Sequence, residues 1–505
     1  MLRRLPCTIV IQLVLLPLVH PWLYSCGTEI RSETTHLPVR LRCVNWYGAH
    51  MKTFVAGGLD KRSCGAIADS IGEIGANCVR IPLSVQVVLQ DPVPPPTAIA
   101  GLNASGCNAS TALEVLDCQV RELTRRGIMV ILNNHNSFAG WVGSYERVPQ
   151  GLWHTADFPT KDWVASLALL AARYRSDPLV VGIDIRNEIH DQNGTVITWG
   201  KTDDVDSDWK AATILAESAI REANPEVLVI VSGLSLSSDL RAMQDLDNYR
   251  SKYVFTTHVY QSSWWFTSIN WRLVLLFSLF FIGGNLGVVC YVHKRYKAWR
   301  PYTTVRTYRR DLPYVISGAV LLPMYAVVVS LVWIEQANQA GCSSIAEDST
   351  PTLYLGMFGL FVVKLAWIVL ATHENVLCWG RLLMYLCLWN VCLGAVQVAL
   401  CVFYQTYGAV LWELRRWDSK HIPVMVGEFG TYLGDTRVAW GWLLHYIRDM
   451  HFAYWPLNGC AQRFETLRND TFGLLDCDWV TIRDVNLTKR IFPDPIEHYK
   501  SRSSN

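Results

Sequence analysis

Short runs of apolar and β-branched residues alternate along this chain with segments of helical periodicity. The run at residues 180–185 is typical, and it ends abruptly in the polar triplet Arg186-Asn187-Glu188. Runs without polar alternation are typical of strands buried on both faces, as in a parallel sheet. Eight runs of this kind occur, at Leu41–Trp46, Cys78–Pro82, Ile128–Leu132, Val180–Ile185, Val227–Val231, Tyr253–Thr257, Ile422–Glu428 and Phe452–Pro456.

Helical patterns separate most of these runs. They cover Ser63–Ile74, Thr111–Arg126, Asp162–Arg175, Trp209–Ala223 and Arg437–Met450, with a closing helix or turn at Trp479–Arg490. Alternating strands and helices predict an α/β fold, either a barrel or a doubly wound sheet. Polar or charged residues follow nearly every strand, which favours a (β/α)8 TIM barrel with its active site at the carboxyl ends of the strands.

A long hydrophobic stretch interrupts the alternation between the sixth and seventh strands. Residues 272–405 contain four apolar segments long enough to cross a bilayer, about 273–292, 312–334, 352–371 and 382–404. The basic loop between the first two indicates the cytoplasmic side. We therefore expect a four-helix transmembrane insertion that divides the barrel into residues 27–271 and 406–505, with both parts on one side of the membrane. Buried helices of a large soluble core are the alternative.

The first 26 residues have the basic, hydrophobic and small-residue regions of a secretory signal peptide or an uncleaved signal anchor. Glycosylation sequons outside the hydrophobic stretch agree with delivery across a membrane. They are Asn103, Asn108, Asn193, Asn469 and Asn486. The sequence thus predicts a multi-pass integral membrane protein whose barrel is extracellular or in the lumen of the secretory pathway.

Fifteen cysteines fit an oxidising compartment. Cys107 with Cys118, and Cys460 with Cys477, are close enough in sequence to be candidate disulfides, although spacing alone does not determine connectivity. No Cys or His cluster has zinc spacing, so we expect no metal, and nothing points to a cofactor. A net charge of +2 does not suggest a nucleic-acid partner. The oligomeric state is left open.

Two carboxylates stand at strand ends that lie across the mouth of such a barrel. Glu188 follows the fourth strand, and Glu428 ends the seventh. Glycoside hydrolysis needs one carboxyl group held protonated to help the leaving group and an ionised partner that attacks the sugar or activates water. The pair therefore makes a glycosidase site a candidate.

The polar residues around this pair resemble those of glycoside hydrolase family 5, the cellulase-like retaining enzymes of clan A. The resemblance covers about residues 39–271 and 421–490 and looks like a secreted plant-type subfamily. It rests on Arg80 in the second strand, His135 after the third, Asn187-Glu188 after the fourth, His258-Val259-Tyr260 after the sixth, Glu428-Phe429-Gly430 at the seventh and Trp455 in the eighth.

The resemblance implies a role for each matched residue. Glu188 is the acid/base and Glu428 the nucleophile, while Arg80 and Tyr260 hold the nucleophile ionised. Asn187 binds the sugar 2-hydroxyl, His135 and His258 are polar clamps, and Trp455 is a sugar platform. Ile189 stands where many members have proline, and the hydrophobic insertion is a second departure.

The expected function is a retaining β-glycosidase acting on a β-glucan-like polysaccharide or oligosaccharide at the membrane surface. Its partners are the carbohydrate and the lipid bilayer. Two alternatives stand beside it. One is hydrolysis of a glycolipid such as a glycosylceramide, because the insertion begins next to an active-site strand. The other is a non-catalytic sugar-binding membrane protein, against which the two intact glutamates argue.

Overall fold

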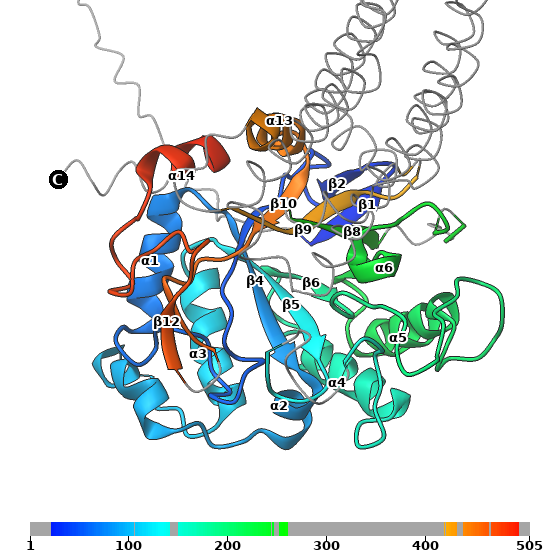
Figure 1. The fold of residues 1–505 in the computed structure, drawn as a ribbon, viewed down its shortest axis with the longest axis horizontal. Helices are drawn as coiled ribbons and strands as arrows, with labels where there is room; N and C mark the ends of the chain where they lie inside the picture. The colour runs from blue at the N-terminus through cyan, green and yellow to red at the C-terminus, as the bar shows by residue number, and fades with distance from the viewer. Residues whose placement is uncertain are drawn as a thin grey trace, which may run out of the picture. The chain divides into compact units, whose positions relative to one another are not determined.

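Eight strands close into a barrel at the centre of the described chain (Figure 1). Their hydrogen-bonded order is β10-β3-β4-β5-β6-β7-β8-β9, so the last barrel strand pairs with the first. Neighbouring strands pair in parallel from β9 through β10 and β3 to β8. The strands are β3 (Arg42–Asn45), β4 (Cys78–Ser84), β5 (Met129–Asn136), β6 (Val180–Asp184), β7 (Leu228–Ser232), β8 (Tyr253–Tyr260), β9 (Val424–Gly430) and β10 (His451–Tyr454). The predicted (β/α)8 barrel is confirmed.

The computed structural model describes residues 22–105, 107–141, 150–243, 245–246, 252–260, 419, 421–431, 438–463 and 466–493. The chain divides into two compact units, Met1–Val259 with Glu413–Asn505, and Tyr260–Trp412. The second unit is described only at Tyr260, the last residue of β8.

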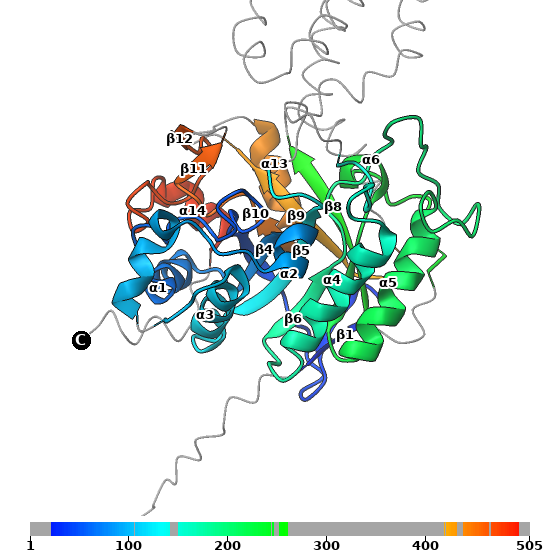
Figure 2. The ribbon, with the colours of Figure 1, turned by 90° about the horizontal axis from the view of Figure 1, so that it is seen from below.

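Helices follow the barrel strands and lie around them (Figure 2). Local sequence explains where they begin: the Ser63 side chain caps α1, and Thr111 forms a capping box with Glu114 at the start of α3. The helices are α1 (Cys64–Ile74), α2 (Val85–Gln90), α3 (Ala112–Thr124), α4 (Thr160–Arg173), α5 (Trp209–Ala223), α6 (Leu234–Ser237), α13 (Val438–Ile447) and α14 (Val485–Ile491). The short α2 and α6 were not predicted from the sequence.

The chain before the first barrel strand forms a hairpin of β1 (Leu23–Cys26) and β2 (Glu29–Ser32). Leu23 and Ile30 are buried in the same apolar cluster as Leu41, Val254 and Met425 of the barrel. β1 thus lies within the last residues of the predicted signal segment, and the boundary at residue 26 stays a prediction. Residues 1–21 lie outside the described part of the chain.

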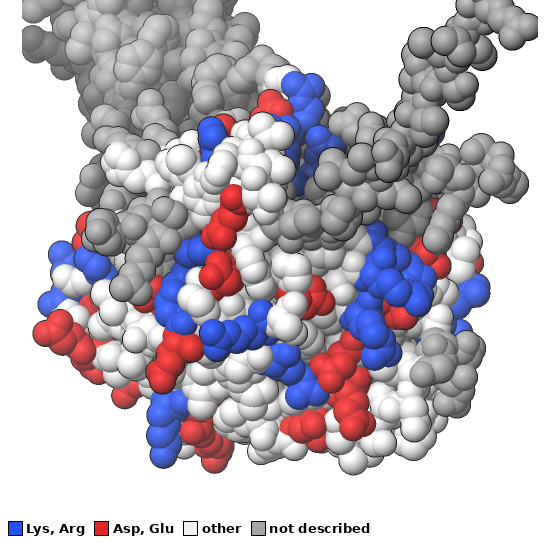
Figure 3. All heavy atoms as spheres, turned by 180° about the vertical axis from the view of Figure 1, so that it is seen from behind, with Lys and Arg blue, Asp and Glu red and all other residues white. Residues whose placement is uncertain are grey.

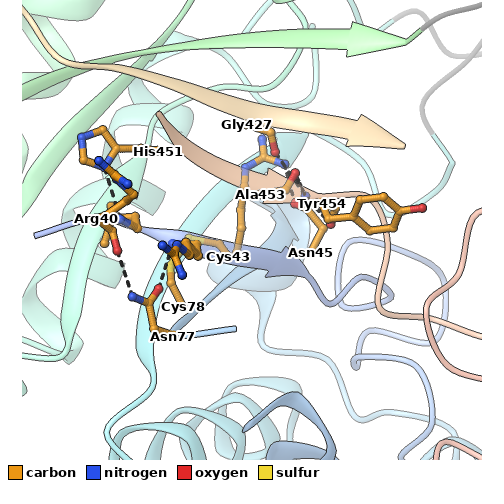
Figure 4. Close-up of a disulfide and its surroundings, with 12 residues drawn as sticks. Arg40, Cys43, Asn45, Asn77, Cys78, Gly427, His451, Ala453 and Tyr454 are labelled. Carbon is orange, nitrogen blue, oxygen red and sulfur yellow. Dashed lines mark hydrogen bonds between the residues drawn. A yellow bond between two sulfur atoms is a disulfide. The ribbon is translucent and has the colours of Figure 1, made fainter. Parts of the chain in front are cut away.

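Disulfides join Cys107 to Cys118 and Cys460 to Cys477, which confirms both predicted pairs. A third bond joins Cys43 to Cys78, which are register partners on β3 and β4 (Figure 4). Their 35-residue separation gave no indication of pairing. The strand register, which only the closed sheet reveals, brings them together.

Asn45 helps to close the barrel where β3 meets the C-terminal strands. Its Nδ2 donates to the carbonyl oxygens of Gly427, Ala453 and Tyr454 at 3.1–3.2 Å (Figure 4). This one side chain thus ties the start of the barrel to β9 and β10, about 400 residues later in the sequence.

Strands β8 and β9 flank the long hydrophobic stretch, and all four predicted transmembrane segments lie outside the described residues. Within the described ranges, no helix is both long and apolar enough to cross a bilayer. The transmembrane insertion therefore gains no support from the described part of the chain.

Two stretches outside the predicted strands and helices contain regular structure. The connection between α2 and α3 includes the 3-10 segment η1 (Pro96–Ser105). After the barrel, β11 (Cys460–Arg463) and β12 (Thr466–Asn469) form a hairpin that was not predicted, and the closing helix begins at Val485 rather than Trp479.

The barrel unit exposes charges of both signs, and Lys and Arg are interspersed with Asp and Glu on the face shown in Figure 3. Of the five sequon asparagines, Asn108, Asn193 and Asn486 are exposed. The side chains of Asn103 and Asn469 lie outside the described set.

Candidate active site

Arg80 is the centre of a buried polar group at one end of the barrel. Its side chain is 1% exposed and donates four hydrogen bonds. The Nε donates to Asp184 Oδ2 at 2.8 Å, one Nη to Glu428 Oε1 at 2.7 Å and Asn45 Oδ1 at 3.0 Å, and the other Nη to Asn187 Oδ1 at 2.9 Å. One guanidinium therefore fixes side chains from three other segments of the barrel.

Glu428 reaches this group because β9 lies very close to β8. The preceding residue is Gly427, and a Cβ there would collide with the Thr256 side chain and approach His258 Nε2. Glycine at this position allows the close approach. The Glu428 side chain is 5% exposed and lies with one oxygen on Arg80 and the other 3.8 Å from His258 Nδ1.

Glu188 follows β6 and faces the same histidine. Its Oε1 lies 2.9 Å from His258 Nδ1, and its side chain is 24% exposed. Ligand atoms of Glu188, His258 and Glu428 all lie within 4.8 Å of one another. Retaining glycosidases have carboxyl groups about 5–5.5 Å apart, whereas inverting enzymes need roughly 6.5–9.5 Å for a water. The spacing therefore fits direct attack by one carboxylate.

Burial shifts the protonation of all three groups. It raises the pKa of Glu188 to about 7, against the opposing charge of Arg80, and lowers the pKa of His258 to about 4. Burial also raises the pKa of Glu428, while His258 and the Arg80 guanidinium oppose that shift. Because Glu428 accepts a hydrogen bond from Arg80, we expect it to ionise before Glu188.

The same three residues are the one place in the described chain where three possible metal ligands meet. The expectation of no metal and no cofactor is not tested by this geometry. Arg80 already supplies a positive charge to Glu428, so a cation there would be repelled by the guanidinium.

Aromatic rings lie beside the carboxylate group. Trp455 stacks with Tyr47 at 5.0 Å between centroids and with His135 at 5.6 Å. Trp141 meets both Tyr47 and Trp455 edge-on, at 5.6 and 6.2 Å. Trp455 is only 6% exposed, so Trp141, which is partly exposed, adds open aromatic surface to this side of the site.

Arg186 also lies in the motif before Glu188, but its hydrogen bonds go to β5 and to the segment that follows it. It is fully buried, and it donates to Asn134 Oδ1 at 3.0 Å and to the carbonyl oxygens of Gln150 and Leu152 at 2.9 and 2.6 Å. Without an acidic neighbour, burial lowers the pKa of Arg186 to about 9. Its contacts hold the two ends of the segment that follows β5.

The structure brings together five predicted site residues directly: Arg80, Asn187, Glu188, His258 and Glu428. His135 and Trp455 contact each other beside this group. Tyr260 is partly exposed, and its expected contact with Glu428 stays a prediction.

Sequence reasoning missed Asp184, Asn45, Tyr47, His50 and Trp141. Asp184 did carry a usable signal, because an aspartate within a run buried on both faces needs a buried partner. The other four gave none, since their contacts depend on how the barrel closes.

Residues 43–278 match the family model of cellulase, glycosyl hydrolase family 5. A glycosyl hydrolase 5 family protein of Chamaecyparis obtusa is 31% identical over 287 residues, which are 53% of this chain and 48% of the relative. An endoglucanase of Paenibacillus polymyxa is 31% identical over 191 residues, 38% of this chain and 45% of the relative. The chain thus spans about half the length of these curated relatives.

Solved structures support the fold. The endocellulase of the archaeon Pyrococcus horikoshii superposes with a TM-score of 0.54 at 18% identity, covering 93% of this chain and 98% of that one. The catalytic domain of the major endoglucanase of Xanthomonas campestris gives 0.52 at 18% identity, with 94% and 100% covered. The solved structures thus share the barrel fold of this chain, and residues 43–278 are similar to the cellulase family.

Proposed function

We propose that the protein is a retaining β-glycosidase that hydrolyses a β-glucan-like polysaccharide or oligosaccharide by double displacement. The observation that carries the proposal is the spacing of Glu188 and Glu428: one oxygen of each lies within 4.8 Å of the other, and Arg80 contacts Glu428. The similarity to endoglucanases supports the substrate class.

In the first step, an ionised Glu428 oxygen bonds to the anomeric carbon as the glycosidic C–O bond breaks. Glu188 gives its proton to the departing sugar oxygen, a role that suits a carboxyl group with a pKa of about 7. In the second step, Glu188 takes a proton from water while the water oxygen bonds to the anomeric carbon and Glu428 is released. Two inversions retain the anomeric configuration.

Neighbouring groups support these steps. Arg80 orients Glu428 and favours its charged form. It also orients Asn187, whose amide is available for the sugar 2-hydroxyl. Trp141 and Trp455 offer aromatic surface to the apolar faces of glucosyl units, and the buried Tyr47 stacks with Trp455.

The location is a further part of the proposal. We place the barrel on the extracellular or lumenal side of a membrane, held by the hydrophobic stretch at 272–405. Support comes from the sequence alone: the length of the apolar segments, the basic loop between them and the sequons outside them.

Activity of the purified full chain tests the reaction. We expect hydrolysis of soluble β-glucan and cello-oligosaccharides, with the β-anomer formed first by NMR. A detergent-dispersed glycosylceramide serves as the rival substrate, and turnover of that lipid alone would contradict the glucan proposal. No turnover of any of these substrates, with binding retained, would instead support a sugar-binding protein.

Variants test the two roles separately. Glu428→Gln removes the nucleophile, so we expect kcat to fall by about 10³-fold or more for every substrate. Glu188→Gln should lose about 10²- to 10⁴-fold on glucans but much less on an aryl glycoside whose leaving group needs no proton. Glu217→Gln, which alters only an ion pair on α5, is the matched control. Equal losses for both variants on both substrates would contradict the assigned roles.

A further inference from the structure

One guanidinium is shared by two buried carboxylates in this site. Arg80 donates from Nε to Asp184 at 2.8 Å and from an Nη to Glu428 at 2.7 Å. The side chains of Arg80 and Asp184 are each 1% exposed, and that of Glu428 is 5% exposed. Little water is present to screen these charges, so each carboxylate affects the other through the arginine.

We infer that Asp184 is a positioning residue for the proposed reaction: it holds Arg80 against Glu428 and, by sharing the guanidinium charge, keeps Glu428 basic enough to attack. This inference rests on the proposed function, because it assigns Asp184 a task in the step that Glu428 performs. Asp184 ends β6 four residues before Glu188, so the strand that positions the acid/base also controls the nucleophile.

The geometry excludes a purely space-filling role for Asp184. Its Oδ2 accepts the hydrogen bond from Arg80 Nε, while the two Nη atoms donate to Glu428, Asn45 and Asn187. Without an acceptor at Nε, the guanidinium would lose one of the bonds that fix its plane. A rotated guanidinium would then misplace Glu428 and Asn187 together.

The charges around Glu428 determine the direction in which its pKa should change when Asp184 is replaced. Arg80 on β4 and His258 stabilise the ionised form of Glu428, whereas Glu188 after β6 acts against it. Asp184 at the end of β6 places a second carboxylate on the same guanidinium, 2.8 Å from its Nε. His258 on β8 faces the same oxygens, and His135 on β5 lies nearby. Without the negative charge of Asp184, the positive charge of Arg80 is no longer partly neutralised, and it attracts the Glu428 carboxylate more strongly. The pKa of Glu428 should then fall, which makes it a weaker nucleophile.

The main test is the pH profile of kcat/KM for Asp184→Asn. Asparagine keeps an acceptor for Arg80 Nε but removes the charge. We expect the acidic limb to move to lower pH by about one unit and kcat to fall by about tenfold or more, with KM changing less. Asp184→Glu, which keeps the charge, should retain the wild-type acidic limb. Asp117→Asn, which breaks a peripheral ion pair with Arg173, is the control and should leave the profile unchanged.

A purely structural role would lower stability without moving the limb, so an unshifted profile in a folded Asp184→Asn protein overturns the inference. A wild-type protein inactive on all glycosides instead counts against the proposed function. The charge of Asp184 can also be measured without an activity assay and without Asp184→Asn. The measurement is the NMR chemical shift of the ¹³C-labelled Asp184 carboxyl group in the wild-type protein, assigned by comparison with Asp184→Glu. We expect an ionised Asp184 at pH 6, and a protonated one would also overturn the inference.

Discussion

At the scale of single residues, burial raises the pKa of both glutamates, and the contact with Arg80 distinguishes them. Glu188 accepts no bond from Arg80 in the described geometry and has a pKa of about 7, while Glu428 lies on the guanidinium. The assignment of acid and nucleophile follows from that difference. Glu188 should be protonated below pH 7, which predicts a basic limb of the rate profile near that pH.

The raised pKa of Glu188 has a consequence for stability. A carboxyl group with a higher pKa in the folded than in the unfolded state makes its full contribution to the free energy of unfolding at low pH. That contribution is lost as pH rises through the folded pKa. For Glu188 this contribution is lost between about pH 4.5 and about pH 7. Glu188→Gln, which cannot ionise, should therefore raise the free energy of unfolding at pH 8 by about 1–3 kcal/mol relative to wild type.

Thermal or urea unfolding of both proteins at pH 4 and pH 8 measures this effect. The two should differ much less at pH 4, where Glu188 is neutral in both the folded and unfolded states. His258 contributes a change in the opposite direction, because its lowered pKa costs stability as pH falls from 6.5 towards 4, and this cost is common to both proteins. A stability difference between the two proteins that does not change with pH would contradict the raised pKa of Glu188.

At the scale of elements, the buried Arg186 side chain holds the segment after β5 in place. Arg186 donates to Asn134 near the end of β5 and to the carbonyl oxygens of Gln150 and Leu152. The Gln150 side chain in turn accepts from the backbone N–H groups of Ser137 and Phe138. Arg186 therefore closes the base of the segment that carries Trp141 towards Trp455.

Arg186→Met keeps the length of the side chain but removes its donors. The buried acceptors would lose their partners, so we expect the free energy of unfolding to fall by about 2–4 kcal/mol. Hydrogen exchange in a peptide spanning 133–141 should quicken, and KM for glucans should rise more than kcat falls. Arg173→Met, at an exposed ion pair, should cost less than about 1 kcal/mol. An unchanged rate of hydrogen exchange at residues 133–141 would contradict the role of Arg186 in holding this segment.

Hydrophobic pattern predicted the barrel strands well because most of their residues are buried; β6 and β7 are buried at every position and almost entirely apolar. The β1–β2 hairpin was missed because Leu23 lies next to the apolar core of the predicted signal and was assigned to it. The Cys43–Cys78 bond and the contacts of Asn45 depend on strand register and closure, which single runs do not contain. Arg80, Glu188 and Glu428 were found because strand ends converge in a barrel.

At the scale of the whole molecule, one closed sheet combines strands from both ends of the chain. β3 pairs with β10, and β10 with β9, although β9 follows the long hydrophobic stretch. The two parts of the barrel must therefore occupy the same compartment. If the hydrophobic stretch crosses a membrane, the number of crossings has to be even, as the proposed four are.

Glycosylation of sequons on both sides of the stretch tests this topology. Asn193 lies in an exposed turn before β8, with Gly194 beside it, and Asn486 is exposed on α14 after β10. When the full chain is made in a eukaryotic secretory system, we expect both to carry glycans. Asn193→Gln and Asn486→Gln should each reduce the mass by one glycan, and glycosidase treatment should remove the difference.

An unmodified Asn486 beside a modified Asn193 would point to an odd number of crossings, which the closed barrel does not permit for a folded protein. Modification of neither residue would contradict the lumenal or extracellular placement. A sequon can also stay unused because its local fold forms first, so a sequon inserted at residues 201–203, in an exposed loop, serves as the positive control for the first part. One inserted at 476–478, also mostly exposed, does the same for the second part. Use of both inserted sequons would establish that β9 and β10 return to the compartment of β3, as a single active site with Glu188 and Glu428 requires.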